Sequence, residues 1–394
     1  MRRTARKNEI YMHVTETVRY LGVSDFTTDL FEGQYKIPEG ITYNSYLIMD
    51  EETAVMDSVD ASFGEEWLAN IKKELGDTPP DYLVVQHMEP DHSASVMSFA
   101  REYPRAKIVA STSAFNMMRG FFGTDFSDRR IVVTDGDTLS LGKHTLRFIT
   151  APMVHWPEVI MTYDEYDKIL FSADGFGRFG NADESSEWAD EARRYYIGIV
   201  GKYGKQVIQA LKKAETLDIQ KIAPLHGPVL TEKLGYYLGL YSKWAGYVPE
   251  ESGVTVAYAS IYGNTRRAAL RLAEELKARG VRTEVFDLAR CDMHAAIASA
   301  FRFDRLVLAS VTYNADVFPA MKSYLHGLIE RGFSGRRVAL IENGSWAPRA
   351  ALVMKELLSG CRDLTFSEGT VKITSAPNEE TNKALSALAD GLCI

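Results

Sequence analysis

The stretch "QHMEPDHSAS" (residues 86–95) places His87, Glu89, Asp91 and His92 within six positions. It follows the apolar run "DYLVV" and leads into an apolar run typical of a helix, so we expect this polar connector to lie beside the core. In an extended connector, residues 87, 89 and 91 would share one face. Imidazole and carboxylate are ligands of transition metals, and these four groups can serve two metal ions if the loop bends between them.

Three more polar residues follow predicted strands elsewhere in the chain. His155 lies in "APMVHWPE", Asp174 in "LFSADGFG" and His226 in "APLHGPV". Loops at strand ends commonly carry functional side chains, so we expect these three residues to join the first four in one metal site. The remaining histidines lack this setting and are expected to be structural: His13, His144, His294 and His326.

Composition limits the function classes. The chain has 394 residues, enough for two or three domains, and its net charge of −8 argues against general nucleic-acid binding. The basic start "MRRTARKNEI" lacks a following apolar run, which argues against a secretory signal, and no window approaches the ~18 apolar residues of a membrane span. Three scattered cysteines argue against a disulfide framework and an iron–sulfur or rubredoxin-like centre, and we expect a cytoplasmic protein.

The first part of the chain mixes short strands, turns and a few helices. Strands are predicted at 42–50, 53–59, 81–87, 107–111, 130–133, 145–152 and 221–227, with a hairpin at 159–174. Helices are predicted at 67–76, 93–103 and 232–246, with a charged helical stretch at 183–214. The segment "YVPEESG" (247–253) reads as a linker, so we predict a first domain at 1–250 and a second at 251–394.

Strands and helices alternate after the linker. Predicted strands lie at 254–260, 281–288, 305–310, 336–342 and 369–375, with helical stretches between them, the first at 264–280. Five strands alternating with helices predict a doubly wound parallel sheet. The fold class is therefore α/β in this half.

The turn "SIYGNTR" (260–266) joins the first of these strands to its helix. Ser260, Asn264 and Thr265 offer hydroxyl and amide groups, and Gly263 lets the backbone approach a ligand. The helix N-terminus offers free N–H groups and the positive end of its dipole. This turn suits a phosphate monoester.

Two other strand ends should line the same crevice, because ligands bind beyond the carboxyl ends of the strands. These ends read "SVTYNADVFP" and "ENGSWAP", and their flat aromatic rings suit stacking on an isoalloxazine ring. Ordinary turns and helix caps are the alternative, which is weaker for three loops than for one. The candidate flavin contacts here are Thr312, Tyr313, Asn314, Asn343, Gly344, Ser345 and Trp346.

This half resembles flavodoxin over residues 254–394. The resemblance implies FMN rather than FAD. Flavodoxins more usually order the Thr or Ser and Gly of this loop slightly differently. The residues implied to hold the phosphate are Ser260, Tyr262, Gly263, Asn264 and Thr265.

The first half is similar to the metallo-β-lactamase fold, an αββα sandwich whose zinc hydrolases carry H-x-H-x-D-H. Glu89 stands here where the second histidine of that motif would be. The ligand set then becomes four histidines and three carboxylates. Added oxygen ligands favour iron over zinc, and Asp174 is the expected bridge between the two half-sites.

The pattern H-x-E-x-D-H, three later ligands and a flavodoxin-like half together resemble the flavodiiron proteins, also called A-type flavoproteins. The match runs over nearly the whole chain. The resemblance implies one iron on His87, Glu89 and His155, a second on Asp91, His92 and His226, and Asp174 between them. It places residues 27–35 over the pocket, where Glu32 either changes proton supply or ligation or is a surface residue.

The same resemblance implies an oxidoreductase that reduces dioxygen to water, nitric oxide to nitrous oxide, or both. Electrons would reach FMN from a separate donor, either a rubredoxin fed by a nicotinamide-dependent reductase or a reduced deazaflavin. Since a short linker would leave flavin and irons apart within one chain, a head-to-tail homodimer, or a tetramer built from two such dimers, is expected.

Two other functions stay open. One is a zinc hydrolase of the lactamase fold with a flavodoxin attached, against which Glu89 and the carboxylate count argue. The other is a non-enzymatic flavin electron carrier whose first domain only docks partners. Unchanged activity after replacing Glu89 or Asp174 with alanine would favour the carrier.

Overall fold

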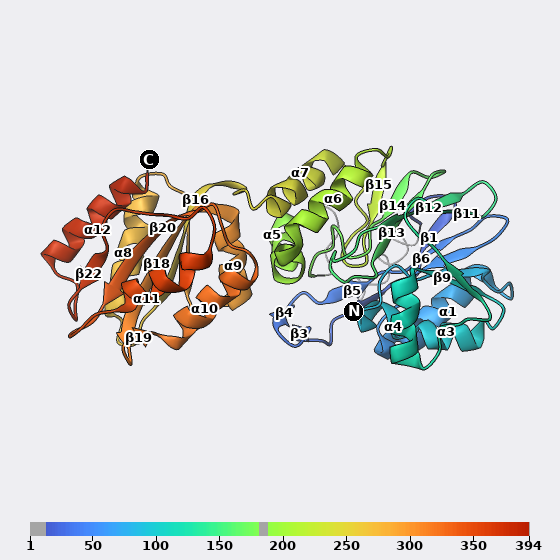
Figure 1. Cartoon of the computed structure of the whole chain (residues 1–394), viewed down its shortest axis with the longest axis horizontal. Helices are drawn as coiled ribbons and strands as arrows, with labels where there is room; N and C mark the ends of the chain where they lie inside the picture. The colour runs from blue at the N-terminus through green and yellow to red at the C-terminus, as the bar shows by residue number, and fades with distance from the viewer. Residues whose placement is uncertain (1–12, 181–187, 394) are drawn as a thin grey trace, which may run out of the picture. The chain divides into compact units, whose positions relative to one another are not determined.

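The computed structural model describes residues 13–180 and 188–393 (Figure 1). The chain forms two compact units, one of Met1–Tyr196 with Lys205–Ser242 and one of Ile197–Gly204 with Lys243–Ile394. Because a short segment before residue 205 groups with the second unit, the domain boundary at residues 250 and 251 stays a prediction. Among the described residues, no helix is long and apolar enough to cross a membrane.

The first sheet of the first unit has six strands in the order β1-β6-β7-β8-β9-β10. Neighbours from β1 to β7 are antiparallel and those from β7 to β10 are parallel. Strands β6, β7 and β8 are buried at every residue, as their short apolar runs predict. The bounds are β1 (Val18–Tyr20), β6 (Tyr46–Ile48), β7 (Ala54–Met56), β8 (Tyr82–Val84), β9 (Lys107–Ala110) and β10 (Arg130–Val132).

The second sheet has five strands in the order β11-β12-β13-β14-β15. Strands β13 and β14 form the predicted hairpin, which confirms that prediction. The bounds are β11 (Thr138–Ser140), β12 (Thr145–Thr150), β13 (Ile160–Asp164), β14 (Ile169–Phe171) and β15 (Lys221–Ala223). Two small antiparallel pairs lie outside both sheets: β2 (Val23–Asp25) with β5 (Ile41–Tyr43), and β3 (Leu30–Phe31) with β4 (Tyr35–Lys36).

Apolar side chains from both sheets share one core. Tyr46 and Val84 of the first sheet pack in the same cluster as Phe148 and Phe171 of the second. Figure 1 shows helices α1, α3 and α4 gathered on one side of this unit. The predicted metallo-β-lactamase-like αββα fold is therefore confirmed.

The helices begin and end where local chemistry favours it. Helix α1 has two glutamates in its first turn and two lysines in its last, which suits the helix dipole, and it ends at Gly76, whose φ is 60°. The bounds are α1 (Gly64–Leu75), α2 (Pro90–Ser93), α3 (Val96–Glu102), α4 (Thr112–Phe122), α5 (Trp188–Tyr195), α6 (Gly204–Ala214) and α7 (Leu234–Ala245). Short η segments lie at Ala61–Phe63, Tyr196–Val200 and Gly201–Tyr203. Part of the predicted stretch 183–214 lies outside the described residues.

The second unit is a doubly wound sheet in the order β17-β16-β18-β20-β21, with β22 also pairing β20 and β19 pairing β18. All of these pairs except β18–β19 are parallel, which confirms the predicted flavodoxin-like fold. The strands are β16 (Glu251–Ala259), β17 (Thr283–Asp287), β18 (Phe303–Tyr313), β19 (Asp316–Val317), β20 (Arg337–Asn343), β21 (Thr365–Phe366) and β22 (Val371–Ile373). The helices are α8 (Asn264–Ala278), α9 (Met293–Arg302), α10 (Pro319–Glu330), α11 (Ala350–Leu357) and α12 (Glu379–Gly391), with η5 at Leu358–Gly360.

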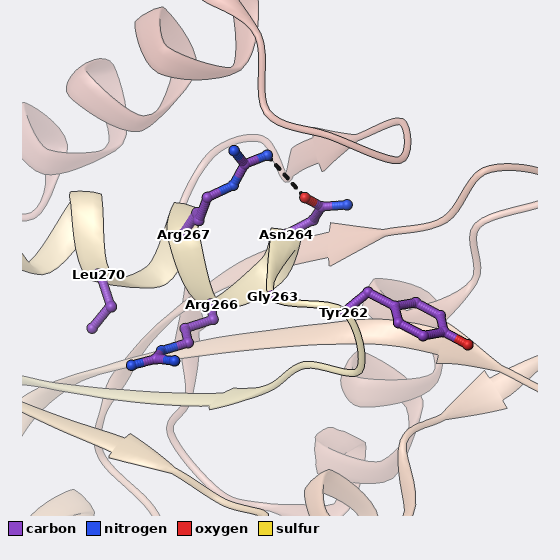
Figure 2. Close-up of a pocket in the computed structure, with 6 residues that line it drawn as sticks. All are labelled: Tyr262, Gly263, Asn264, Arg266, Arg267 and Leu270. Carbon is purple, nitrogen blue, oxygen red and sulfur yellow. Dashed lines mark hydrogen bonds between the residues drawn. The ribbon is translucent and has the colours of Figure 1, made fainter.

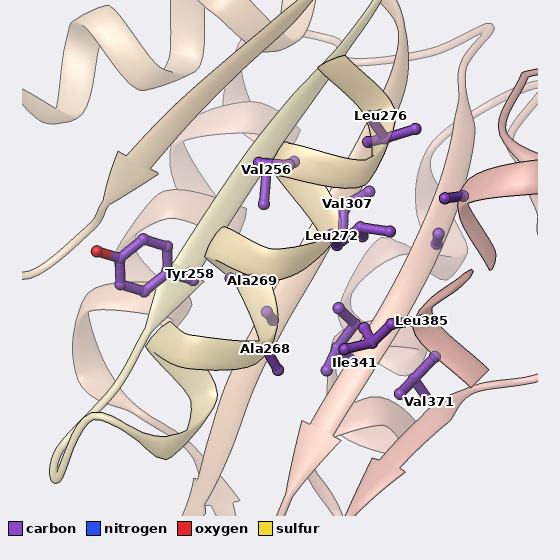
Figure 3. Packing of buried hydrophobic residues seen from close by; sticks show 14 of the residues in the cluster. Val256, Tyr258, Ala268, Ala269, Leu272, Leu276, Val307, Ile341, Val371 and Leu385 are labelled. Carbon is purple, nitrogen blue, oxygen red and sulfur yellow. The ribbon is translucent and has the colours of Figure 1, made fainter. Parts of the chain in front are cut away.

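Helices cover both faces of this sheet (Figure 1). Leu272 and Leu276 of α8 pack with Leu385 of α12 against Val256 and Val307 of the central strands (Figure 3). The spacing of Leu272 and Leu276 puts both on one helix face, as the sequence pattern indicates. This packing fixes the N-terminus of α8 at the edge where β16 ends.

Two predicted boundaries in this half are wrong. The predicted linker runs to residue 253, but β16 begins at Glu251, because Glu251 pairs with Phe303 before an irregularity in the register. The predicted loop after residue 310 is partly strand, since β18 continues to Tyr313 and turns back into β19. Extra pairing partners, which the local sequence does not reveal, extend both strands.

A buried ion pair joins the start of β12 to the end of β13. Nδ1 of His144 lies 2.9 Å from Oδ2 of Asp164, and both side chains are almost fully buried. Burial disfavours the charged imidazole, but the hydrogen bond and charge of Asp164 outweigh it and raise the pKa of His144. A raised histidine pKa contributes stability that is complete below about pH 6.5 and is lost as the pH rises through the folded-state pKa.

We expect His144→Gln to lower the free energy of unfolding by about 3 kcal/mol at about pH 6, because it leaves Asp164 buried without its partner. The difference from wild type should shrink at alkaline pH. Urea unfolding at both pH values measures it, with the exposed His326→Gln as control. A difference that grows with pH would contradict the assignment.

Candidate metal centre and phosphate-binding edge

Four predicted ligands form the first half-site. Nε2 of His87 lies 3.3 Å from Oε2 of Glu89 and 3.2 Å from Nε2 of His155. Oδ2 of Asp174 lies 3.0 Å from the His155 nitrogen and 3.3 Å from the His87 nitrogen. All four ligand atoms lie within 4.8 Å of one another. The structure thus brings together residues that are far apart in the sequence.

The other three predicted ligands form a second half-site. Nε2 of His92 lies 3.0 Å from Nε2 of His226, and Oδ2 of Asp91 lies 3.3 Å from each of these nitrogens. Oδ1 of Asp174 lies 3.4 Å from the His92 nitrogen and 3.8 Å from the His226 nitrogen. Asp174 therefore directs one carboxylate oxygen toward each half-site.

The short helix α2 divides residues 86–95 between the two half-sites. Pro90 starts α2, and the amides of His92 and Ser93 both donate to the carbonyl of Glu89 at 2.9 Å. Proline suits a first helical position because it lacks the N–H that would go unpaired there. Residues 87, 89 and 91 would share a face only in an extended connector, and the chain instead turns into a helix at Pro90, which carries Asp91 to the other half-site.

Polar atoms of the centre lack ordinary partners. Both carboxylate oxygens of Asp91 and Oδ1 of Asp174 are buried and accept no hydrogen bond. Burial alone would raise the pKa of Asp174, but the charge of His87 and the hydrogen bonds of His155 and His87 hold it well below its usual range. Burial likewise opposes the charged His155, yet hydrogen bonds to Asp174 and Glu89 raise its pKa to about 9. Converging imidazoles and unpaired buried carboxylates fit bound cations.

Outer residues that the sequence reasoning missed orient the ligands. Oε1 of Glu158 lies 2.8 Å from Nδ1 of His87 and also accepts from the amide of Met88 at 2.8 Å. Nδ1 of His226 lies 2.6 Å from the carbonyl oxygen of Thr42. A partner on the far nitrogen fixes the tautomer and ring orientation of a ligating histidine. Glu158 lies three residues after His155, and that position could have indicated its role from the sequence. The contact of the Thr42 carbonyl with His226 leaves no signal in the sequence.

The segment at residues 27–35 borders the centre, as the resemblance implies. The ring of Phe31 lies 5.4 Å from the ring of His226. Burial of its carboxyl and the Glu89 charge raise the pKa of Glu32 to about 7. Glu32 is itself exposed beside Gly33, so both interpretations of it, as a surface residue and as a residue that acts on the centre, stay predictions.

The phosphate loop lies at the carboxyl end of β16. Ser260 accepts a hydrogen bond from the amide of Gly263 at 3.2 Å, and Gly263 has a φ of 87° at the start of α8. A cavity of about 450 Å³ opens here, and the exposed ring of Tyr262 lies at its side (Figure 2). Its lining residues are Tyr262, Gly263, Asn264, Arg266, Arg267 and Leu270, of which the last three were not predicted. Thr265 is buried within the helix start.

The other two predicted loops reach the same edge, since β16, β18 and β20 are parallel neighbours. Tyr313 is 44% exposed and Trp346 is 82% exposed, which leaves both rings free to stack. Thr312 instead caps a helix, because its hydroxyl accepts from the amides of Arg349 and Ala350. Asn314 lies in the β18–β19 turn. Asn343 donates to the Ser375 carbonyl at 3.2 Å, and the hydroxyls of Ser345 and Ser375 lie 2.7 Å apart. Gly344 lies between Asn343 and Ser345 in the sequence.

A third polar group lies at the other end of β12 and β13 from the centre. It consists of His144, Asp164 and Asp167. His144 pairs with Asp164, and the Asp167 carboxylate accepts from the hydroxyl of Thr17 at 2.7 Å. Nε2 of His144 is buried without a hydrogen-bond partner, so the expectation that His144 is structural stays a prediction.

Known proteins share both halves of this arrangement. Residues 41–227 match a family model described as "ODP family beta lactamase", and residues 256–367 match the flavodoxin model. A nitric oxide reductase of Moorella thermoacetica is 28% identical over 93% of this chain and 94% of its own. The flavodiiron protein of Giardia intestinalis superposes with a TM-score of 0.89 at 28% identity, covering 97% of this chain and 96% of its own. Rubredoxin oxygen:oxidoreductase of Desulfovibrio gigas superposes at 0.88 with 25% identity and 96% of each chain.

The chain belongs to the flavodiiron proteins. Its flavodoxin domain makes FMN one cofactor, and the histidine–carboxylate centre of the first unit makes two iron ions the other. The chain is thus an oxidoreductase of this family.

Substitution of Glu158 tests whether this residue orients the ligand His87 of the flavodiiron centre. We expect Glu158→Ala to weaken iron binding about 10- to 100-fold, because His87 loses the partner of its far nitrogen. Glu158→Gln should restore part of that affinity, since its amide oxygen can still accept. Competition with a chelator measures the affinity, and the exposed Glu215→Ala is the control. Equal affinities in all four proteins would contradict a positioning role.

Proposed function

We propose that this protein reduces dioxygen to water, nitric oxide to nitrous oxide, or both, with electrons delivered through FMN. The single observation that carries the proposal is the position of Asp174, whose two oxygens face two separate histidine–carboxylate half-sites. A centre for two metal ions on the same chain as a flavin-binding sheet suits electron transfer to a small molecule better than hydrolysis.

The ligand assignment is part of the proposal. His87, Glu89 and His155 would hold one iron, Asp91, His92 and His226 would hold the other, and Asp174 would serve both. Bound iron supplies the redox chemistry for a diatomic substrate, and FMN supplies electrons singly. Ser260, Tyr262, Gly263, Asn264 and Thr265 would hold the FMN phosphate, and the exposed rings of Tyr313 and Trp346 would be available to stack on the flavin.

The chain's own residues prepare the centre in three ways. The three ligand carboxylates offset positive charge inside a buried site. Glu158 and the carbonyl of Thr42 hold the rings of His87 and His226 in position. The rings of Phe31 and Tyr195, each 5.4 Å from the His226 ring, limit the access of water to that side.

Electrons arrive from a separate donor in this proposal. Cys291, Cys361 and Cys393 form no disulfide in the described part of the chain, and they are too scattered in the sequence for an iron–sulfur or rubredoxin-like centre. A rubredoxin is the proposed donor, with reduced deazaflavin as the alternative. We propose a cytoplasmic head-to-tail homodimer, or a tetramer built from two, in which the flavin of one chain serves the irons of the other. A monomer with full turnover would overturn the assembly.

The test is metal and flavin content of anaerobically purified protein, followed by mixing the reduced protein with dioxygen or nitric oxide. We expect two irons and one FMN per chain, and flavin reoxidation that depends on the irons. Zinc in place of iron, together with hydrolysis of a thioester or β-lactam, would overturn the proposal in favour of a hydrolase. Flavin reoxidation at the same rate without iron would favour an electron carrier.

A further inference from the structure

Asn44 lies between β5 and β6 and contacts the loop that carries His226. This loop, residues 224–227, follows the end of β15 at Ala223 and has no regular secondary structure, so its backbone groups need hydrogen bonds from elsewhere. Asn44 is 0% exposed, and 180 positions of the sequence separate it from Pro224. A fully buried amide therefore meets the loop of a predicted metal ligand from a distant part of the chain.

The side chain of Asn44 holds the backbone on both sides of His226. Its Nδ2 donates to the carbonyl of Pro224 at 2.8 Å and to the carbonyl of Gly227 at 2.8 Å. Because a carbonyl oxygen can only accept, both contacts require the amide nitrogen. The hydroxyl of Tyr20 donates to Oδ1 of Asn44 at 2.8 Å and holds the amide in this orientation. Both side-chain N–H groups of Asn44 are thus directed to the loop.

Backbone contacts connect the same loop to the residue before the shared carboxylate. The amide of Asn44 donates to the carbonyl of Leu225 at 2.8 Å. The amide of Leu225 donates in turn to the carbonyl of Ala173 at 2.9 Å, and Ala173 directly precedes Asp174. Substitution of Asn44 keeps these backbone bonds and removes the two bonds that its side chain makes beside His226.

We propose that Asn44 is a positioning residue for the metal ion of the second half-site. It acts through His226, whose Nε2 lies 3.0 Å from Nε2 of His92 and 3.3 Å from Oδ2 of Asp91. With the backbone held on both sides of His226, its imidazole is kept in this geometry before the metal arrives, and binding requires less ordering. The inference rests on the proposed function only in that this centre holds metal ions.

Loss of the Asn44 amide affects the two carbonyls unequally. The carbonyl of Pro224 also accepts from the hydroxyl of Tyr46 at 2.8 Å and keeps that partner. The carbonyl of Gly227 loses the contact in a buried setting, and an unpaired buried polar group is unfavourable. The loop should therefore shift on the Gly227 side, directly after His226, and carry the imidazole away from the other ligands.

Cobalt(II) titration of the full-length apoprotein tests this, because the visible bands of bound cobalt report its ligands without turnover. Wild type should bind two equivalents. Asn44→Ala should weaken one of the two sites about tenfold and change its absorption bands. Asn44→Ser, which keeps one donor, should weaken the same site less and keeps the test available should Asn44→Ala not fold. Asn70→Ala, which also removes an amide that donates to a backbone carbonyl, should match wild type.

A double variant tests whether Asn44 acts through His226. His226→Ala should bind one equivalent of cobalt, at the first half-site. Adding Asn44→Ala to it should leave the affinity and the bands of that remaining site unchanged, because residues that act through one group are not additive. A further loss of affinity in the double variant would mean that Asn44 supports the whole domain, and the positioning role would be overturned.

The remaining outcomes separate this inference from the proposed function. Wild-type cobalt affinities and bands in a folded Asn44 variant would overturn the role of Asn44 and leave the metal centre intact. Equal weakening of both sites would also overturn it, because His226 belongs to the second half-site alone. Failure of wild type to bind cobalt or iron would overturn the proposed function, and this inference with it.

Discussion

Asp174→Asn is expected to reduce the iron content from two per chain to one or none and to lower turnover at least about 100-fold. The substitution keeps the shape of the side chain and removes its negative charge. Since Asp174 directs one oxygen to each half-site, this single change weakens both metal positions. Iron and flavin per chain, measured in the same preparation as turnover with dioxygen and nitric oxide, check the prediction.

The size of this effect follows from charge and burial. The Asp174 side chain is 1% exposed and lies among His87, His92 and His155. Without its carboxylate, two cations and several imidazoles would share a buried site with too little negative charge, which is strongly unfavourable in a low-dielectric interior. An asparagine oxygen can face only one half-site, and its amide nitrogen repels the metal in the other.

Asp164→Asn is the matched control. Asp164 is also a fully buried aspartate, and it also lies 2.9 Å from a histidine nitrogen. This variant should lose stability and keep iron, FMN and turnover per folded protein. Should both variants lose iron equally, the loss would reflect general damage to the sandwich and the role given to Asp174 would be wrong.

The sequence predicts which residues form the metal centre better than it predicts how those residues are arranged. His155, Asp174 and His226 are recognisable because each follows a strand, and strand ends converge on one edge. The division of residues 86–95 between the two half-sites could not be predicted from the alternation of residues 87, 89 and 91. The helix that begins at Pro90 depends on packing as well as on local preference. Orienting contacts such as the Thr42 carbonyl with His226 join residues far apart in the chain and leave no trace in either segment.

The loops at the flavin-binding edge of the second unit show the same limit, since their place is predictable from the sequence and their internal shape is not. Parallel strands β16, β18 and β20 end together, so the three loops were predicted at the correct edge. Their internal shape was not, because Asn314 and Ala315 adopt positive φ angles in a turn that pairs Tyr313 with Asp316. Alanine gives no signal for such a turn, and the pairing of β18 with β19 imposes it.

Gly263→Val is expected to lower FMN affinity by more than tenfold and to leave the iron content unchanged. Gly263 has a φ of 87° at the start of α8 and lines the cavity (Figure 2), and the first N–H groups of a helix have no partner within it. A β-branched residue is strongly disfavoured at this angle, and shifting it out of the left-handed region moves those N–H groups away from the phosphate. Flavin release on dilution, followed by fluorescence, measures the affinity.

Gly280→Val separates backbone strain from the loss of the phosphate site. Gly280 follows the other end of α8 with a φ of 78°, and a Cβ added at either glycine would meet no atom within 4 Å. Both substitutions therefore impose similar strain of about 1–2 kcal/mol on the same helix, while only Gly263 borders the cavity. Selective loss of FMN in Gly263→Val assigns the cavity to the phosphate. Equal loss in both variants would mean that helix stability alone controls flavin binding, and the phosphate would then have to lie elsewhere on this edge.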